Sequence, residues 1–296
     1  CRHAKHNRRR FNQSHVFFMK TMTTTSHLTQ KAPPQQLLKL MMLASSNLPI
    51  GSYTYSQGVE SAIEQGFIHD EASSLAFLQA YQQEVLLNFE LPLMASMMQL
   101  SAQTTHHSLV DSLANFYGAS RDSHEFLLES QQLAQAFCAW LDGVLDLAMP
   151  QDWIAQGYLP LFARLAYFWQ LPIADSLTTY AFAQMENLTL AIVKTLPLGQ
   201  MAGQRIIWQL GQAMDEPIAK LCQTQASKVK TALTAIHHRQ AVVAKLQNIA
   251  PQFLQAQQHA QTLLILINHL QLSASVPSLA ELSCHHEQQY SRLFRS

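Results

Sequence analysis

The sequence predicts an all-α protein, and three of its properties support that prediction. The chain of 296 residues contains only 9 Gly and 11 Pro, so the residues that interrupt helices and form turns are scarce. Ala, Leu, Gln and Met, which favour helices, are abundant. Apolar residues recur at helical spacing, and 48% of the residues are hydrophobic, which is enough for a substantial core. We therefore expect a single multi-helix globular domain over residues 34–296.

Helix breakers divide this domain into successive helices. Ser45–Gly51 is a cluster of turn formers that ends the first helix, and Gly66 is placed to stop the second. Asp70 is placed to cap a long third helix, which Pro92 should kink or restart. Apolar spacing predicts the other helices over residues 35–44, 60–65, 109–117, 122–147, 159–169, 173–195 and 198–214.

The later helices also have recognisable ends. Asp175 is placed to cap the helix that starts near Ile173, and Lys194 at its other end complements the helix dipole. Pro197 is expected to open the next helix at its first position. Residues 215–272 are rich in Gln with interleaved Ala, Leu, Ile and Val, which predicts one or two extra helices.

Charge is unevenly distributed along the chain. Residues 1–31 hold 7 Lys and Arg with no Asp or Glu, which leaves 12 basic and 19 acidic residues in the rest of the chain. An acidic body is a poor nucleic-acid binder, because phosphate contacts need clustered Lys and Arg. We expect residues 1–33 to be a basic extension that is disordered or not native coding sequence. Binding to an anionic surface and an organelle transit peptide are the alternatives.

The cysteines and the apolar runs indicate the environment of the protein. Cys1, Cys138, Cys222 and Cys284 are far apart and form no C-x-x-C pair, so neither a zinc knuckle nor a disulfide scaffold is predicted. No apolar run approaches the ~20 residues that a membrane span needs. We expect a cytoplasmic protein with reduced thiols.

No group of residues in the sequence predicts an active site. The chain has no G-x-S-x-G elbow and no Gly-rich phosphate loop, and its carboxylates are scattered. Its 14 histidines include the pairs His106–His107, His237–His238 and His285–His286, but neighbours on a helix point ~100° apart, whereas helical chelates use i and i+4. We predict no catalytic, cofactor or metal site. A helical metal carrier or metalloenzyme that uses these pairs is the alternative.

Two internal segments have the residues of protein interfaces. Leu48–Glu60 combines a rigid Pro, permissive Gly and two Tyr in one loop, and Tyr is enriched at interfaces. Gln200 and Gln204 stand one turn apart on one helix face. Gly199 and Gly203, also one turn apart, would let another backbone come close. For both segments, packing within the chain's own domain is the alternative.

The last dozen residues form a third such segment. They alternate charged, aromatic and apolar residues, which is unusual for a frayed terminus. Tyr290, Leu293 and Phe294 would form one apolar stripe on a helix, while Arg292 and Arg295 supply donors for a partner's carboxylates. A last helix that packs on its own domain is the alternative.

The three segments resemble the signatures of one family. Leu48–Glu60 is similar to L-P-[IV]-G-x-[FY]-[ST]-[YH]-S-x-G-[LV]-E, and Lys194–Gln204 is like a P-L-G-Q-x-x-x-Q helix start. The ending His286–Ser296 is similar to H-E-x-Q-Y-S-R-L-F-R-S. All three are features of the urease accessory protein UreF family. Other positions that fit the family pattern are Asp70, Ser120, Arg121, Glu125, Glu129 and Ser130.

This resemblance implies a function. Members of the UreF family are all-helical cytoplasmic proteins that dimerise and bridge a second accessory protein, UreD (also called UreH), to the GTPase UreG. The assembly delivers nickel into apo-urease. UreF itself orders and regulates the GTPase and is not the catalyst. Its C-terminal tail, residues 277–296 here, is expected to become ordered on UreD.

Carried over to this chain, the resemblance also implies which residues bind partners. Expected contacts to UreD are His286, Glu287, Tyr290, Arg292, Leu293 and Phe294. The dimer or GTPase-facing surface is expected to use Tyr53, Tyr55, Ser56, Gln57, Glu60, Lys194, Gln200 and Gln204. The chain departs from the family at Ala134, Ala280 and His285, where Gly, Asp and Arg are usual. Residues 215–272 exceed what the family needs, so we expect a Gln-rich helical insertion there.

Overall fold

Every regular element in the described part of this computed structural model is a helix, which confirms the predicted all-α class. The structure describes residues 33–52, 57–103, 106–121, 123–247, 255–273 and 281–283. None of the described helices is long and apolar enough to cross a membrane. The helices are α2 (Pro34–Ala44), α3 (Val59–Glu64), α4 (Glu71–Tyr81), the π-helix η2 (Gln82–Glu90), α5 (Leu91–Ser101), α6 (His107–Ala119), α7 (His124–Leu145), α8 (Gln151–Ala155), α9 (Tyr158–Phe168), α10 (Ile173–Thr195), α11 (Gln200–Gln212), α12 (Asp215–Gln247) and α13 (Gln255–Leu270).

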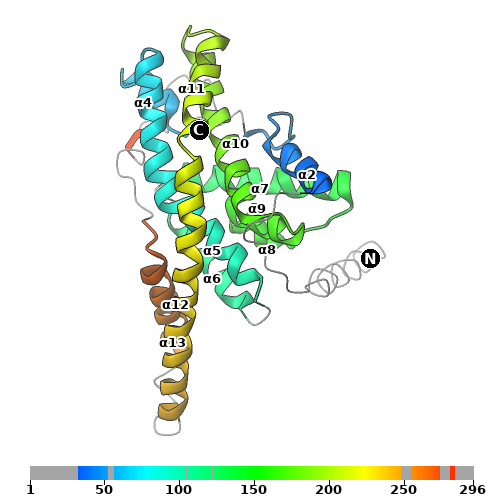
Figure 1. Cartoon of the computed structure of the whole chain (residues 1–296), viewed down its shortest axis with the longest axis vertical. Coiled ribbons are helices and arrows are strands. Elements are labelled where there is room, and N and C mark those ends of the chain that lie inside the picture. Colours follow the sequence, from blue (N-terminus) through cyan, green and yellow to red (C-terminus); the bar gives the residue numbers. More distant parts are fainter. Residues whose placement is uncertain are drawn as a thin grey trace.

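Two helices in the middle of the molecule form much of the core. α5 buries every residue from Leu91 to Met98, and α9 buries every residue from Tyr158 to Ala166. A helix that is buried on all sides must be surrounded by other helices. α5 packs against α9, and α10 packs against α2 and α11. In Figure 1, α4 and α11 lie at one end of the molecule, while α12 and α13 run side by side toward the other.

The predicted third helix is a continuous succession of α4, η2 and α5. Asp70 caps α4 as predicted: its carboxylate accepts from Ser73 N–H at 2.8 Å, and the Ser73 hydroxyl accepts from the Asp70 N–H at 3.0 Å. Pro92, in the first turn of α5, has no N–H to donate to the Asn88 carbonyl. That carbonyl accepts a hydrogen bond from Ser273 N–H at 3.3 Å. The helix therefore changes from a π-helix to an α-helix at Leu91, next to Pro92, and no loop interrupts it.

One predicted cap residue and one predicted helix start are wrong, and one short helix was not predicted. Pro172 precedes α10 and no side chain caps it; Asp175 lies within the first turn, where its charge favours the helix dipole. α11 begins at Gln200 after Gly199, whose φ of 75° no continuing helix permits, so Pro197 precedes the helix and does not open it. α8 has 5 residues, too few for apolar spacing to predict it.

Residues 215–272 contain two helices, as predicted. α12 and α13 pack on each other, and α12 also packs on α5. Val229 and Ile236 of α12 are each 2% exposed, so this stretch contributes to the core. Its origin as an insertion stays a prediction. The predicted basic extension and C-terminal tail lie outside the described residues, apart from residue 33 and residues 281–283.

Gly203 is a point of close approach between α11 and α10, inside the domain. A Cβ at this position would lie 2.9 Å from Val193 Cγ2 and 3.5 Å from Thr189 Cγ2. Gly203→Leu is therefore expected to destabilise the protein by about 1 to 3 kcal/mol, because the added side chain forces the two helices apart. Gly211 in the same helix has open space around its Cβ position, so Gly211→Leu is the matched control. Urea unfolding measures both, and equal losses would contradict the close packing at Gly203.

Candidate functional site

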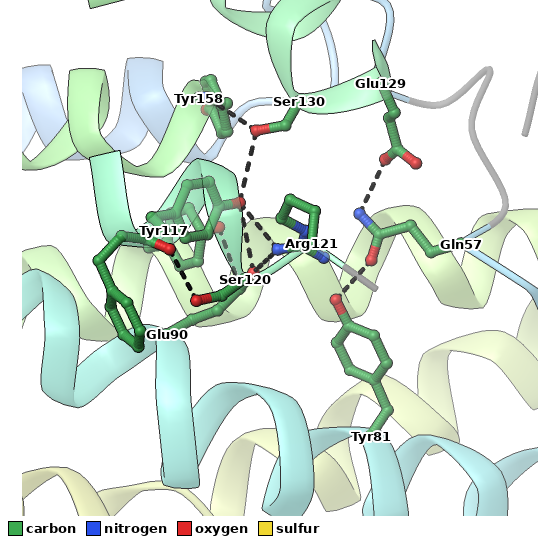
Figure 2. A network of polar contacts seen from close by, with 11 residues as sticks. Gln57, Tyr81, Glu90, Tyr117, Ser120, Arg121, Glu129, Ser130 and Tyr158 are labelled. Carbon is green, nitrogen blue, oxygen red and sulfur yellow. Dashed lines mark hydrogen bonds and ion pairs between the residues drawn. The ribbon is translucent and has the colours of Figure 1, made fainter. Parts of the chain in front are cut away.

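A cluster of polar side chains lies in the interior, where α4, η2, α6, α7, α9 and α10 meet (Figure 2). Polar side chains at this depth are stable only when they are paired. Apart from Gln57 and Arg121, every member is at most 6% exposed. The members of this polar cluster are Gln57, Tyr81, Glu90, Tyr117, Arg121, Glu129, Ser130, Tyr158 and Tyr180.

An ion pair between Glu90 and Arg121 forms the centre of the polar cluster. Arg121 Nη1 donates to Glu90 Oε1 at 2.9 Å, and the two side chains are only 11% and 3% exposed. The second carboxylate oxygen of Glu90 accepts from the Tyr180 hydroxyl at 3.0 Å. Arg121 also donates to the Tyr117 hydroxyl at 3.0 Å. These partners compensate the cost of burying a carboxylate directly before the apolar helix α5.

Aromatic rings hold the Arg121 guanidinium in place. Its central carbon lies 5.1 Å from the ring centroid of Tyr117 and 5.8 Å from that of Phe126, distances at which a cation is attracted to a ring face. Burial alone would lower the pKa of Arg121, but Tyr117 and Glu90 outweigh burial and raise it. The positive charge is therefore permanent, which makes the Glu90 carboxylate a necessary partner.

Gln57 holds the end of the Leu48–Glu60 loop against the polar cluster. Its Nε2 donates to Glu129 Oε1 at 2.8 Å, and its Oε1 accepts from the Tyr81 hydroxyl (Figure 2). The backbone turns sharply here, because φ is 47° at Gln57 and 85° at Gly58. Helices α4 and α7 thus fix the loop at its C-terminal end.

The described part of the C-terminal tail is fixed at the start of the same helix, α7. We call Leu282 and Ser283 the tail root; they are 7% and 1% exposed. Ser283 Oγ lies 2.7 Å from Ser123 Oγ. Ser123 is the N-cap of α7, and its hydroxyl accepts from Phe126 N–H at 3.1 Å. The N-terminal part of α7, close to Arg121 in the chain, therefore holds both the end of the Leu48–Glu60 loop and the tail root.

The polar cluster is too small to be a reaction site. It encloses a cavity of about 10 Å³. This is about the room that one water molecule needs, whereas small-molecule pockets have roughly 300 to 1,000 Å³. Within the described ranges, no group of three or more His, Cys, Asp or Glu side chains is placed to hold a metal ion. The cluster therefore positions backbone segments and has no space for a substrate.

The outer face of α11 presents polar and apolar side chains together. Gln200 and Gln204, two of the predicted partner contacts, are exposed on it. Met201 and Trp208, seven residues apart, are 71% and 68% exposed. We call these four residues the α11 face. Exposed Trp and Met are characteristic of interfaces, and the seven-residue spacing that places them together could have been recognised in the sequence.

The other predicted partner residues lie in different places. Lys194 is exposed in the last turn of α10, where its charge was expected. Glu60 in α3 is only 9% exposed, and Gln57 points into the polar cluster. Both therefore support the loop from the inside. Residues outside the described ranges are Tyr53, Tyr55, Ser56, His286, Glu287, Tyr290, Arg292, Leu293 and Phe294.

Comparison with known proteins identifies the family. A family model described as UreF matches residues 68–211. A urease accessory protein UreF from Nitrosospira multiformis is 32% identical over 268 residues, which cover 88% of this chain and 97% of that protein. The chain belongs to the UreF family.

Other UreF relatives are similar over different lengths. A urease accessory protein UreF from Nitrosococcus oceani is 37% identical over 187 residues, covering 62% of this chain and 83% of that protein. A bifunctional urease accessory protein UreEF from Bordetella bronchiseptica is 29% identical over 285 residues, covering 94% of this chain and 56% of that protein. The residues that the UreF model matches include every member of the polar cluster except Gln57.

The tyrosines of the polar cluster predict an alkaline transition in this UreF chain. Burial raises the pKa of Tyr117 from 10.0 to about 12, and burial also raises those of Tyr81, Tyr158 and Tyr180. Above pH 10 the folded chain keeps protons that the unfolded chain releases, so the free energy of unfolding should fall as pH rises toward 12. Phenolate absorbance in native protein and in urea measures this; coincident titrations would contradict the burial. Phenolate absorbance reports only the tyrosines, so it separates their titration from that of other groups in the chain.

Proposed function

We propose that this chain is a urease maturation accessory protein that bridges UreD (UreH) to the GTPase UreG. It regulates the GTPase while nickel is delivered, as cargo, into apo-urease. The observation that carries the proposal is the position of two partner-binding segments, the Leu48–Glu60 loop and the C-terminal tail. The loop end and the tail root are held by the same part of α7. A single rigid support for two binding segments suits a protein that brings two partners together.

Action by binding, without catalysis, is supported by the site and by the relatives. The polar cluster has no room for a substrate, its Glu90 and Arg121 form an ion pair with each other, and Gln57 donates to Glu129. The relatives are named as accessory proteins, and the Bordetella bronchiseptica relative is a bifunctional UreEF. A relative that combines two accessory proteins in one chain supports our proposal that this chain acts within a single maturation assembly. We place this assembly in the cytoplasm.

Each surface has a proposed role. The tail contacts UreD, and ordering it there costs several kcal/mol, which the apolar stripe of Tyr290, Leu293 and Phe294 offsets. The loop residues Tyr53, Tyr55 and Ser56 contact a partner, while Gln57 and Glu60 hold the loop. The α11 face, with Lys194, binds a second copy of the chain or the GTPase.

Removal of the tail tests the bridging role. The full chain and a chain that ends at Ser283 are co-purified with UreD and UreG, and nickel-dependent urease activation is scored. We expect the full chain to bridge both proteins. The shortened chain should lose UreD because it lacks the tail residues that contact UreD, while the tail root and the polar cluster remain in place. Retention of UreD by the shortened chain, or failure of the full chain to bind either protein, would overturn the proposal.

A substitution on the α11 face tests the second surface. Trp208→Glu places a charge at the centre of an apolar contact and should abolish self-association or UreG binding, with UreD binding unchanged. Leu264 on α13 is 56% exposed and outside the proposed surface, so Leu264→Glu is the matched control. Size-exclusion chromatography with light scattering measures both. Equal behaviour of the two variants would show that the α11 face binds neither partner.

A further inference from the structure

Two histidines that are distant in sequence meet between α12 and the start of α6. The ring centroids of His106 and His237 are 5.5 Å apart, and their planes are tilted by 38°. Each belongs to a pair of adjacent histidines, completed by His107 and His238. Adjacent histidines on one helix diverge and do not chelate. The fold instead brings one member of each pair together.

The spacing of the two rings fits a shared metal ion. Two imidazole nitrogens that bind one ion at about 2.0 to 2.1 Å, in a tetrahedral arrangement, place their ring centroids roughly 5 to 5.5 Å apart. The observed 5.5 Å lies at the upper end of this range.

Both histidines stand on fixed backbone. His106 is the N-cap of α6: its N–H donates to the Gln103 carbonyl, and its own carbonyl accepts from Leu109 N–H, both at 3.0 Å. His237 lies in the interior of α12 and follows Ile236, which is 2% exposed. Metal binding would therefore order few additional groups, so little of the binding free energy is lost to conformational entropy.

We propose that His106 and His237 bind one divalent late-transition-metal ion, which ties α12 to α6. Imidazole nitrogen suits Ni²⁺, Cu²⁺ and Zn²⁺, whereas Mg²⁺ and Ca²⁺ prefer oxygen ligands. Within the described ranges no third His, Cys, Asp or Glu side chain joins the two histidines, and we assign the remaining coordination positions to water. The resulting site is open and exchangeable, as a site for transient metal would need to be. The inference stands whether or not the chain bridges UreD and UreG.

Nickel titration of the full chain tests the proposal, with calorimetry as the readout for the wild type, H106A, H237A and the double variant. Because the chain has 14 histidines, background binding is expected, and the comparison between variants isolates the site. Each single variant should lose the same one equivalent of bound Ni²⁺, or bind it about a hundredfold more weakly. Two linked ligands bind an ion more tightly than a single ligand by about that factor. The double variant should lose no more than either single variant.

H238A is the matched control, because His238 is the exposed neighbour of His237 and points away from it. H238A should still bind the one equivalent of Ni²⁺ that the wild type binds at this site. Mg²⁺ should bind at this site in neither H238A nor the wild type. Hydrogen exchange gives a second readout: Ni²⁺ should slow exchange around His106 and His237 in the wild type and in H238A only. Losses that add in the double variant, or an equal loss in H238A, would overturn the proposal. Unchanged UreD and UreG binding by H106A separates this result from the bridging function.

Discussion

Glu90→Ala is expected to destabilise the protein by about 3 to 5 kcal/mol, the usual cost of removing one partner from a buried ion pair. The Arg121 guanidinium is 11% exposed and would keep its charge without a counterion. The Tyr180 hydroxyl would also lose its acceptor. Urea denaturation followed by circular dichroism measures the effect. Because the polar cluster holds the end of the Leu48–Glu60 loop through Gln57, weaker binding of the partner that contacts this loop should accompany the loss.

Two further variants define the cause. Glu84→Ala, in the same π-helix but exposed, is the matched control and should change stability by no more than about 0.5 kcal/mol. Glu90→Gln keeps the shape and one acceptor oxygen and should fall between the other two. If the Glu90→Ala and Glu84→Ala proteins were equally stable, the Glu90–Arg121 ion pair would not stabilise the folded protein.

Gly157→Ala is expected to destabilise the protein by about 2 to 5 kcal/mol, from overpacking and backbone strain together. Gly157 has a φ of 96°, which side chains rarely adopt. A Cβ there would lie 2.5 Å from Ser130 Oγ and 3.2 Å from Tyr117 Cε1. Ser130 Oγ accepts from the Tyr158 N–H at 3.0 Å, so the added methyl group would push apart α6, α7 and α9 at the polar cluster. The thermal unfolding temperature measures the loss.

Gly143→Ala is the control for this glycine. Gly143 lies exposed in α7 with open space around its Cβ position. Alanine favours the helix by about 1 kcal/mol over glycine, so this variant should be more stable than the wild type. The two substitutions are chemically identical and should have opposite signs. A stable Gly157→Ala protein would mean that the cluster can move away from the added methyl group.

Most helices could be predicted from the sequence because their determinants are local. The helix over residues 173–195 begins and ends where apolar spacing placed it. The Asp70 cap and the Gly66 stop depend on residues within one turn, and both are present, with a φ of 80° at Gly66. The predictions that failed concern one cap and one start. Asp175 lies inside the first turn of α10 and does not cap it, and the positive φ of Gly199 separates Pro197 from the start of α11.

The functional surface was only partly predictable. Its segments were found through resemblance, and Arg121, Glu129 and Ser130 were recognised as positions of the family pattern. No sequence pattern marks Glu90, although it directly precedes the apolar run of α5. A buried carboxylate gives no periodic signal, since its partner Arg121 is 31 residues away and joins it only when α6 packs on η2.

The all-α class, the positions of most helices and the family are predictable from the sequence, because propensity, capping and motif spacing depend on neighbours in the chain. Which polar groups face each other depends on how the helices pack. This packing brought Gln57 to Glu129, Ser283 to Ser123 and His106 to His237. Such contacts form when apolar helix faces pack, and the buried polar groups must then find partners among residues that the packing brings close.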